Sequence, residues 1–267
     1  MEKVTVLDFA RKKASGEKIT MLTAYDFPTA RIIDGSGIDA ILVGDSLGMV
    51  VLGYDSTVRV SMRDMMHHAK AVARGVKRAL VIADMPFMSY QTDPATAVRN
   101  AGRFVREAGC SAVKIEGGGE MVERARAIVS AGIPVIGHLG LTPQSCSKMG
   151  GYKVQGRDSR KAGEIIADAR RLEEAGCFAL ILECVPVSLA REVTAKAGIP
   201  TIGIGAGADC DGQVLVINDI IGYFEDFLPR FAKQYARVSD VVRKAVQDFK
   251  KDIERGEFPD KDHSFTG

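Results

Sequence analysis

Five residues that can carry charge or exchange protons stand at the ends of successive short apolar runs. They are Asp45, Asp84, Glu116, His138 and Glu183. If the runs are parallel strands of a barrel, these side chains meet at one mouth, where such barrels hold their active sites. Crowded carboxylates repel one another unless a cation or protons compensate. Oxygen ligands suit a hard divalent ion, Mg²⁺ before Mn²⁺ or Ca²⁺, and zinc is the weaker candidate because no compact His/Cys set accompanies them.

Each acid also has a structural explanation. An acid after a strand is often the N-cap of the next helix, and Asp45-Ser46 and Asp84-Met85-Pro86 fit that role too. Glu is a poor N-cap, so Glu116 and Glu183 favour a chemical role. Five such residues in register are harder to explain as caps, and we therefore expect a site.

A lysine lies inside the fourth run. Lys114 comes two residues before Glu116, so strand alternation places both side chains on one face. A lysine in an apolar strand needs an anionic partner, either a substrate carboxylate or Glu116 itself. A buried Lys–Glu ion pair is the structural alternative. A Schiff-base role is weaker, because neighbouring carboxylates would keep the amine protonated.

Two further motifs are less specific. His67-His68 lies in a helix expected over 62–77, away from the strand ends, which favours surface or capping roles over metal ligation. The glycine-rich segment 203–207 follows the seventh run, a region that in barrels often offers backbone N–H groups to an anion. As a dinucleotide motif it is incomplete, because Ala208 stands where the last glycine would be.

The elements that would position these residues are eight short apolar runs separated by longer amphipathic stretches. Each run is nearly continuous in apolar residues, as strands covered on both faces are. The runs are 19–24, 40–44, 79–83, 111–115, 133–137, 178–182, 200–204 and 213–217.

The stretches between the runs carry helix signals. Asp93 is a good N-cap, Pro94 suits the first helical position, and apolar residues then follow at helical spacing up to Gly109. An Ala-Gly pair recurs before four runs, and its glycine can take the left-handed conformation that ends a helix. The pairs are Ala108-Gly109, Ala131-Gly132, Ala175-Gly176 and Ala197-Gly198.

This repeated βα pattern predicts an α/β protein. Eight strands in 267 residues favour a single-domain (β/α)₈ TIM barrel over an open doubly wound sheet. The domain would span residues 1–267, with a C-terminal helix over 238–254 and a polar tail over 258–267. Two long connections, 45–61 and 138–156, are expected to act as lids over the strand ends.

Composition narrows the function classes. A net charge of +2 with interspersed acids and bases argues against nucleic-acid and membrane partners. No apolar run approaches the roughly 20 residues of a membrane span, and no secretory h-region is evident. The number of cysteines is odd, five, and no C-x-x-C occurs, which argues against a disulfide framework and fits a reducing cytoplasm.

From about residue 18 to about 231 the sequence resembles the ketopantoate hydroxymethyltransferase family. The motifs that carry the resemblance are TAYD at 23–26, VGDSLGMV at 43–50, ADMPF at 83–87, VKIEG at 113–117, GHLGLTPQ at 137–144 and GIGAG at 203–207. One mild departure is Cys184 after the last strand-end acid, to which we attach no mechanistic meaning.

The resemblance implies transfer of a hydroxymethyl group from the cosubstrate 5,10-methylenetetrahydrofolate to 3-methyl-2-oxobutanoate. The product would be 2-dehydropantoate, a precursor of pantothenate and coenzyme A. It also implies a homo-oligomer, a homodecamer. The resemblance further implies one Mg²⁺ per subunit, held by Asp45, Asp84 and Glu116. It implies that the keto acid contacts Asp45, Ser46, Asp84 and Lys114, and that Glu183 is the general base.

His138 is expected beside these residues as a further substrate contact, from its position at a strand end. The site would then stabilise an enolate of the 2-oxo acid, with the metal as Lewis acid. Two alternatives stay open. One is another Mg²⁺-dependent 2-oxo-acid barrel enzyme of the phosphoenolpyruvate mutase/isocitrate lyase type, and the other is a non-catalytic binding barrel.

Overall fold

The computed structural model describes residues 2–265. The chain divides into two compact units, Met1–Val216 and Ile217–Gly267, and each is described by itself.

The first unit is a closed barrel of parallel strands, which confirms the predicted (β/α)₈ TIM barrel. Each strand pairs with the next, and β1 closes the ring by pairing with β8. All eight expected runs overlap a strand. The strands are β1 Ile19–Thr23, β2 Ala40–Val43, β3 Leu80–Asp84, β4 Ala112–Glu116, β5 Val135–Gly140, β6 Ala179–Glu183, β7 Thr201–Ile204 and β8 Gly212–Leu215.

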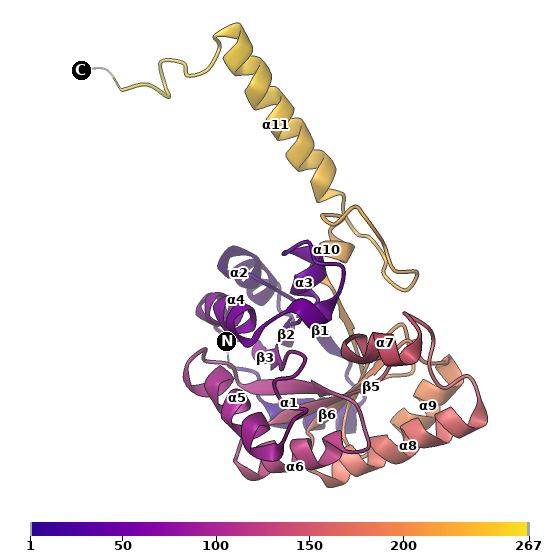
Figure 1. The fold of residues 1–267 in the computed structure, drawn as a ribbon. Helices are drawn as coiled ribbons and strands as arrows, with labels where there is room; N and C mark the ends of the chain where they lie inside the picture. Colours follow the sequence, from indigo (N-terminus) through magenta and orange to yellow (C-terminus); the bar gives the residue numbers. More distant parts are fainter. Residues whose placement is uncertain (1, 266–267) are drawn as a thin grey trace. The chain divides into compact units, whose positions relative to one another are not determined.

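Helices surround these strands (Figure 1). They are α1 Val6–Ser15, α2 Phe27–Gly35, α3 Leu47–Val50, α4 Met62–Gly75, α5 Pro94–Arg106, α6 Met121–Ser130, α7 Cys146–Met149, α8 Ser159–Glu174 and α9 Val187–Lys196. Two 3₁₀ turns add η1 Thr57–Arg59 and η2 Pro143–Ser145. The expected lid segments therefore contain α3 with η1, and η2 with α7.

Helix α5 forms for the predicted reasons. Asp93 Oδ1 accepts a hydrogen bond from Thr96 N at 2.8 Å, and Pro94 begins the helix. The helix ends at Arg106, and Gly109 then turns the chain into β4 with a φ of 79°. The same positive φ occurs in two more of the four Ala-Gly pairs, at Gly132 and Gly176.

Helix α1 was not predicted, and it closes the N-terminal end of the barrel. Its Phe9 is fully buried in one cluster with the inward-facing strand residues. Lys12 pairs with Asp39 at 2.7 Å, and Lys13 pairs with Asp211 at 2.8 Å. These two acids immediately precede β2 and β8, so the helix covers the end opposite to the strand-end acids.

One crossover departs from the repeated pattern. Residues 205–211 alone join β7 to β8, without a helix. This connection contains the glycine-rich segment, in which Gly205 and Gly207 have positive φ.

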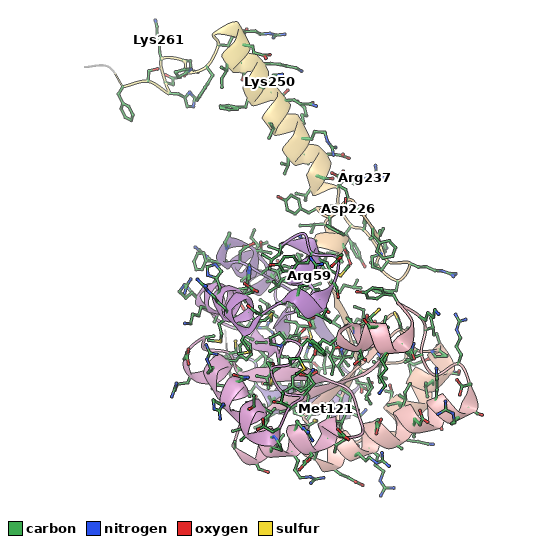
Figure 2. The ribbon with its side chains drawn as sticks, in the orientation of Figure 1. Arg59, Met121, Asp226, Arg237, Lys250 and Lys261 are labelled. Atoms are coloured by element: carbon green, nitrogen blue, oxygen red, sulfur yellow. The ribbon has the colours of Figure 1, made fainter. Side chains whose placement is uncertain are left out.

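The second unit holds α10 Ile217–Ile220 and α11 Val238–Arg255, which confirms the helix expected over 238–254. Lys250, labelled in Figure 2, pairs with Glu254 one turn further along α11 at 3.5 Å. The last two residues of the predicted polar tail, 266 and 267, lie outside the described residues.

The sequence predicts neither a membrane span nor a disulfide framework, and the structure bears on both points. In the described part of the chain, no helix has the length and apolar character needed to cross a membrane. All five cysteines are free thiols.

Candidate active site

The predicted site residues meet at the carboxyl end of the barrel. Asp84, Glu116 and Glu183 are the last residues of their strands, and Asp45 follows β2 by two residues. His138 was expected to end its strand, but it lies inside β5, which continues to Gly140. Parallel register places Asp84 beside Lys114 and Glu116 beside His138. The residues of this cluster are buried, except Glu183, which is partly exposed.

None of the four acids is a helix N-cap. The N-caps of the helices that follow β2, β3, β4 and β6 are Ser46, Asp93, Glu120 and Pro186. The capping explanation is therefore wrong, and these carboxylates are buried for another reason.

Lys114 lies at the centre of the cluster. Its Nζ is 3.2 Å from Asp84 Oδ1, from Glu116 Oε1 and from His138 Nδ1. Burial alone would lower the pKa of Lys114, but the negative charges of Asp84 and Glu116 outweigh burial and raise it. The amine is therefore an ammonium, which counts against a Schiff-base nucleophile. The predicted Lys–Glu ion pair forms, and Asp84 joins it.

Glu116 is ionised, and both of its oxygens are engaged. Burial raises its pKa, but Lys114 and His138 outweigh this effect and lower the pKa to about 2. Oε1 lies 3.2 Å from Lys114 Nζ and 3.2 Å from His138 Nδ1, and Oε2 accepts a hydrogen bond from Gln144 N at 3.0 Å.

The pKa values of Asp45 and Asp84 shift in the opposite direction to that of Glu116. Burial raises the pKa of both, and the charges of Asp84 and Glu116 raise the pKa of Asp45 further. Asp84 Oδ2 accepts a hydrogen bond from Asp45 N at 3.0 Å, so the two residues are adjacent. Among the described residues, Asp84 Oδ1 has no aligned hydrogen-bond donor. Two buried carboxylates with raised pKa values are the condition that a bound cation relieves.

The donor set can be tested against Mg²⁺. Within residues 2–265 no three His, Cys, Asp or Glu side chains converge as a ready ligand set. However, Mg²⁺ is usually held by one or two carboxylates, with water and substrate oxygens completing its shell. Asp45 and Asp84 fit that mode because they are adjacent and burial raises the pKa of both, whereas the pKa of Glu116 is lowered by its partners; the oxygens of Asp84 and of Glu116 all contact other groups. The three-carboxylate set stays a prediction, in which Asp45 and Asp84 have the stronger support.

His138 links the buried cluster to its open edge. Its Nε2 is 3.2 Å from Glu183 Oε2, although these atoms are not aligned as a hydrogen bond. Burial and Lys114 lower the pKa of His138, but Glu116 and Glu183 outweigh them and raise it to about 9. The Glu183 side chain is 15% exposed, so solvent or a substrate reaches it.

Ser46 completes the set of predicted contacts. Its side chain makes no capping hydrogen bond to α3. Instead its Oγ lies 2.8 Å from the hydroxyl of Tyr25. His68, from the predicted non-ligand pair, bonds through Nδ1 to the Tyr25 carbonyl at 2.6 Å, which supports a structural role.

Sequence reasoning missed two residues of the site. They are Gln144 and Tyr90, and both are buried. Gln144 donates hydrogen bonds to the carboxylates of Asp45 and Glu116, and the Tyr90 hydroxyl bonds to Gln144 and to the Glu116 backbone. Gln144 follows β5 within the GHLGLTPQ motif, so its place after a strand was the one available signal. Tyr90 follows β3 by six residues and carried no signal.

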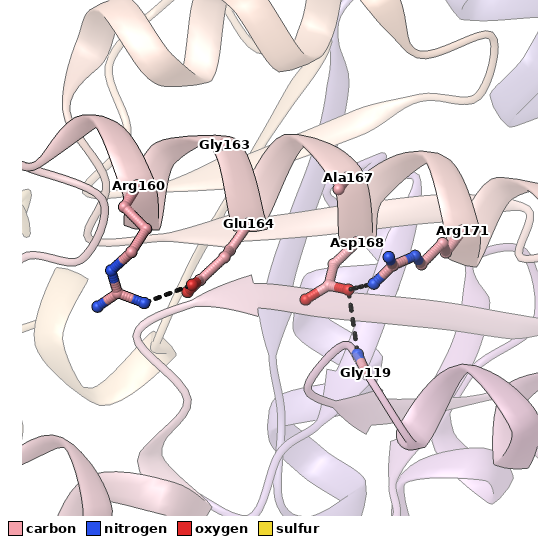
Figure 3. Close-up of a pocket in the computed structure, with 7 residues that line it drawn as sticks. All are labelled: Gly119, Arg160, Gly163, Glu164, Ala167, Asp168 and Arg171. Atoms are coloured by element: carbon pink, nitrogen blue, oxygen red, sulfur yellow. Dashed lines mark hydrogen bonds and ion pairs between the residues drawn. The ribbon is translucent and has the colours of Figure 1, made fainter.

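A surface cavity of about 440 Å³ lies elsewhere, along α8 (Figure 3). Its charged side chains pair with each other, Arg160 with Glu164 at 2.5 Å and Arg171 with Asp168 at 3.2 Å. None of the strand-end acids lines it, so this cavity is separate from the cluster at the barrel mouth.

The comparisons with known proteins show the family of this chain. The family model described as ketopantoate hydroxymethyltransferase matches residues 3–261. A 3-methyl-2-oxobutanoate hydroxymethyltransferase of Acetivibrio thermocellus is 56% identical over 264 residues, which cover 99% of this chain and 93% of the relative. Another of the same name, from Syntrophus aciditrophicus, is 56% identical over 263 residues, 98% of this chain and 97% of the relative.

Solved structures show the same fold. A phosphonopyruvate hydrolase complex with oxalate and Mg²⁺ superposes with a TM-score of 0.63 at 13% identity, covering 99% of this chain and 92% of that one. A 2,3-dimethylmalate lyase, of the PEP mutase/isocitrate lyase superfamily, superposes with a TM-score of 0.61 at 18% identity, covering 98% and 91%. At these identities the likeness concerns the fold alone.

Proposed function

Because this chain belongs to the ketopantoate hydroxymethyltransferase family and is therefore a transferase, we propose a specific reaction for it. It transfers a hydroxymethyl group from 5,10-methylenetetrahydrofolate to 3-methyl-2-oxobutanoate and forms 2-dehydropantoate for pantothenate biosynthesis. The family match over residues 3–261 and relatives of that name at 56% identity support the proposal. Family membership also excludes the non-catalytic barrel.

One observation of the site carries the proposal. A buried ammonium, Lys114, lies within 3.2 Å of two carboxylates at a mouth that holds a third, Asp45. Acids outnumber the ammonium, so the cluster favours a further cation as well as an anionic substrate beside Lys114.

We assign one Mg²⁺ per subunit to Asp45 and Asp84, with Glu116 as the third carboxylate of the site. When bound, this ion supplies a Lewis acid for the keto and carboxylate oxygens of a 2-oxo acid. Lys114 places a positive charge beside the same oxygens, where the enolate charge develops. The Ser46 hydroxyl and His138 Nε2 contact the substrate.

Glu183 is the proposed general base. It lies at the open edge of the cluster, 3.2 Å from His138 Nε2, and takes the proton from C3 of 3-methyl-2-oxobutanoate. One water hydrolyses the methylene bridge of the folate: both of its C–N bonds break, the two nitrogens take the protons of the water, and tetrahydrofolate and formaldehyde result. The electron pair left on C3 then attacks the formaldehyde carbon, and the new alkoxide takes the proton from Glu183. His138 stays beside the protonated carboxyl and keeps it oriented.

A second candidate is another 2-oxo-acid enzyme of the phosphoenolpyruvate mutase/isocitrate lyase type, whose fold this chain shares. Folate dependence separates the two. Purified protein with Mg²⁺ and 3-methyl-2-oxobutanoate should form 2-dehydropantoate only when methylenetetrahydrofolate is added, and a chelator should abolish turnover. Consumption of the 2-oxo acid at the same rate without folate would favour the second candidate.

The metal assignment has its own test. Asp84→Asn should lose most Mg²⁺ binding in titration calorimetry while its circular dichroism stays unchanged, because one of two adjacent ligands loses its charge. Unchanged affinity would refute the assignment.

The remaining predictions about partners are proposals as well. The protein would work as a single-domain subunit in the cytoplasm, on small molecules, with neither a nucleic acid nor a membrane as partner. We propose a homodecamer, supported only by family resemblance. Light scattering should then give about ten times the chain mass of 28.7 kDa.

A further inference from the structure

Gln144 bonds to the segments that follow three successive strands. Its backbone N donates to Glu116 Oε2 at 3.0 Å, at the end of β4. Its side-chain Nε2 donates to Asp45 Oδ2 at 2.9 Å, after β2, and to the Met85 carbonyl at 2.9 Å, after β3. The side chain is buried, so these bonds form out of contact with water.

The orientation of this amide is determined by its surroundings. Oε1 accepts from the Tyr90 hydroxyl at 2.9 Å and from Gln91 Nε2 at 3.1 Å. Two donors therefore face the oxygen, and two acceptors, Asp45 Oδ2 and the Met85 carbonyl, face the nitrogen. The reversed amide would place its oxygen against the Met85 carbonyl and the Asp45 carboxylate and its nitrogen against Gln91 Nε2, so the observed orientation is the favourable one.

Tyr90 links the Gln144 amide to the backbone of Glu116. It is fully buried, and its hydroxyl also accepts a hydrogen bond from Glu116 N at 3.0 Å. Burial raises the pKa of Tyr90, so the phenol keeps its proton and donates it toward Gln144. The two residues together tie the Glu116 backbone and carboxylate to the Asp45 carboxylate.

We propose that Gln144, held by Tyr90, is a positioning residue for the metal-binding carboxylates. Its side-chain amide holds the Asp45 carboxylate, and its backbone N–H holds the Glu116 carboxylate, without adding a positive charge. A lysine or arginine in this place would neutralise the carboxylates and oppose a divalent cation, whereas an amide leaves the negative charge of the site intact. The inference rests on the metal site of the proposed function.

The test measures Mn²⁺ and Mg²⁺ affinity by calorimetry, independently of turnover. Gln144→Met keeps the length of the side chain but removes its donor and acceptor, and should raise the Kd of both ions at least tenfold. Tyr90→Phe, which frees the amide oxygen, should raise it less. Gln155→Met is the matched control, because this partly exposed amide in the same connection donates to the Lys153 carbonyl at 2.9 Å and to none of the carboxylates, and the Kd of this variant should not change.

The outcomes separate this inference from the proposed function. If Gln144→Met keeps the wild-type Kd while Asp84→Asn loses binding, the metal site stands and the positioning role is wrong. If the wild-type protein binds neither ion, both are wrong. Should Gln144→Met fail to fold by circular dichroism, Tyr90→Phe decides, and a wild-type Kd in that variant overturns the proposal.

Discussion

Removing the central ammonium is the perturbation that tests the electrostatics of the site most severely. Lys114→Met keeps the length of the side chain but removes the ammonium beside Asp84 and Glu116 and leaves His138 as the cation next to Glu116. At 3.2 Å and an effective dielectric constant near 20, each of the two closest ion pairs corresponds to about 5 kcal/mol of Coulomb energy. Desolvation offsets much of this energy, and breaking one buried pair by removing a partner costs about 3–5 kcal/mol.

The assay is thermal unfolding of the metal-free protein. With roughly 2–4 °C per kcal/mol for a chain of this size, the Tm of Lys114→Met should fall by about 6–20 °C. Adding Glu116→Gln should recover part of the loss, because one carboxylate is then neutral. Mg²⁺ should also narrow the difference from wild type, since a divalent ion restores positive charge.

A surface lysine provides the matched control. Lys196 pairs with Glu192 at 2.6 Å, but the two side chains are 61% and 48% exposed. Such pairs contribute about 0–1 kcal/mol, so Lys196→Met should hardly change the Tm. If Lys114→Met were as stable as Lys196→Met, the buried cluster would not be organised around an ammonium, and the reasoning would be refuted.

Three more predictions concern the proposed general base, the stability of the fold at low pH and the packing around Gly140. Glu183→Gln should lower kcat by about 10²–10⁴ and preserve substrate binding, measured by steady-state kinetics and calorimetry. Burial raises the pKa of Asp39, but hydrogen bonds from Lys12 and Thr20 outweigh burial and lower it. Asp39→Asn should therefore cost about 1–3 kcal/mol at pH 7 in urea unfolding, a difference that shrinks progressively as the pH falls from about 4 through the lowered pKa of Asp39. Gly140→Ala should destabilise the fold by more than about 2 kcal/mol, because its φ is 93° and the new Cβ would lie 2.2 Å from Glu183 O.

Each of these has a control and a contrary result. Glu164→Gln, on the surface of α8, should leave kcat unchanged, and wild-type turnover of Glu183→Gln would remove that residue from the mechanism. A stability difference for Asp39→Asn that did not shrink at all between pH 5 and pH 2 would mean that packing and not charge is responsible. Gly102→Ala, a helix position with open space around it, should be neutral or stabilising. Equal stabilities of the Gly140→Ala and Gly102→Ala variants would contradict the expected clash between the new Cβ at position 140 and Glu183 O.

The barrel could be predicted because its strands are covered on both faces and therefore read as unbroken apolar runs. The boundary of β5 could not, because Leu139 and Gly140 continue the strand by pairing with Leu182 and Glu183 of β6, which lie more than 40 positions away in the chain. Helix α1 was missed because Phe9 is its one buried residue in a lysine-rich segment, and its position depends on distant partners such as Asp39.

The site shows the same division. Asp84, Glu116 and Glu183 could be found because each ends a strand, and strand ends converge in a barrel. Gln144 and Tyr90 could not be found in this way, because their importance comes from bonds across the mouth to residues 26 to 99 positions away in the chain. Local sequence shows a polar residue in a connection and an aromatic residue after a strand, and nothing more.

The central claim is that this cluster removes the C3 proton of a 2-oxo acid, and hydrogen exchange tests it directly. In D₂O with Mg²⁺ and 3-methyl-2-oxobutanoate but no folate, proton NMR should show the C3 signal disappear at a rate set by enzyme concentration. Exchange should fall to the buffer rate in Glu183→Gln and with excess chelator. Loss of the C3 signal no faster than in buffer with the wild-type enzyme and Mg²⁺ would contradict an enolate-forming centre at this mouth.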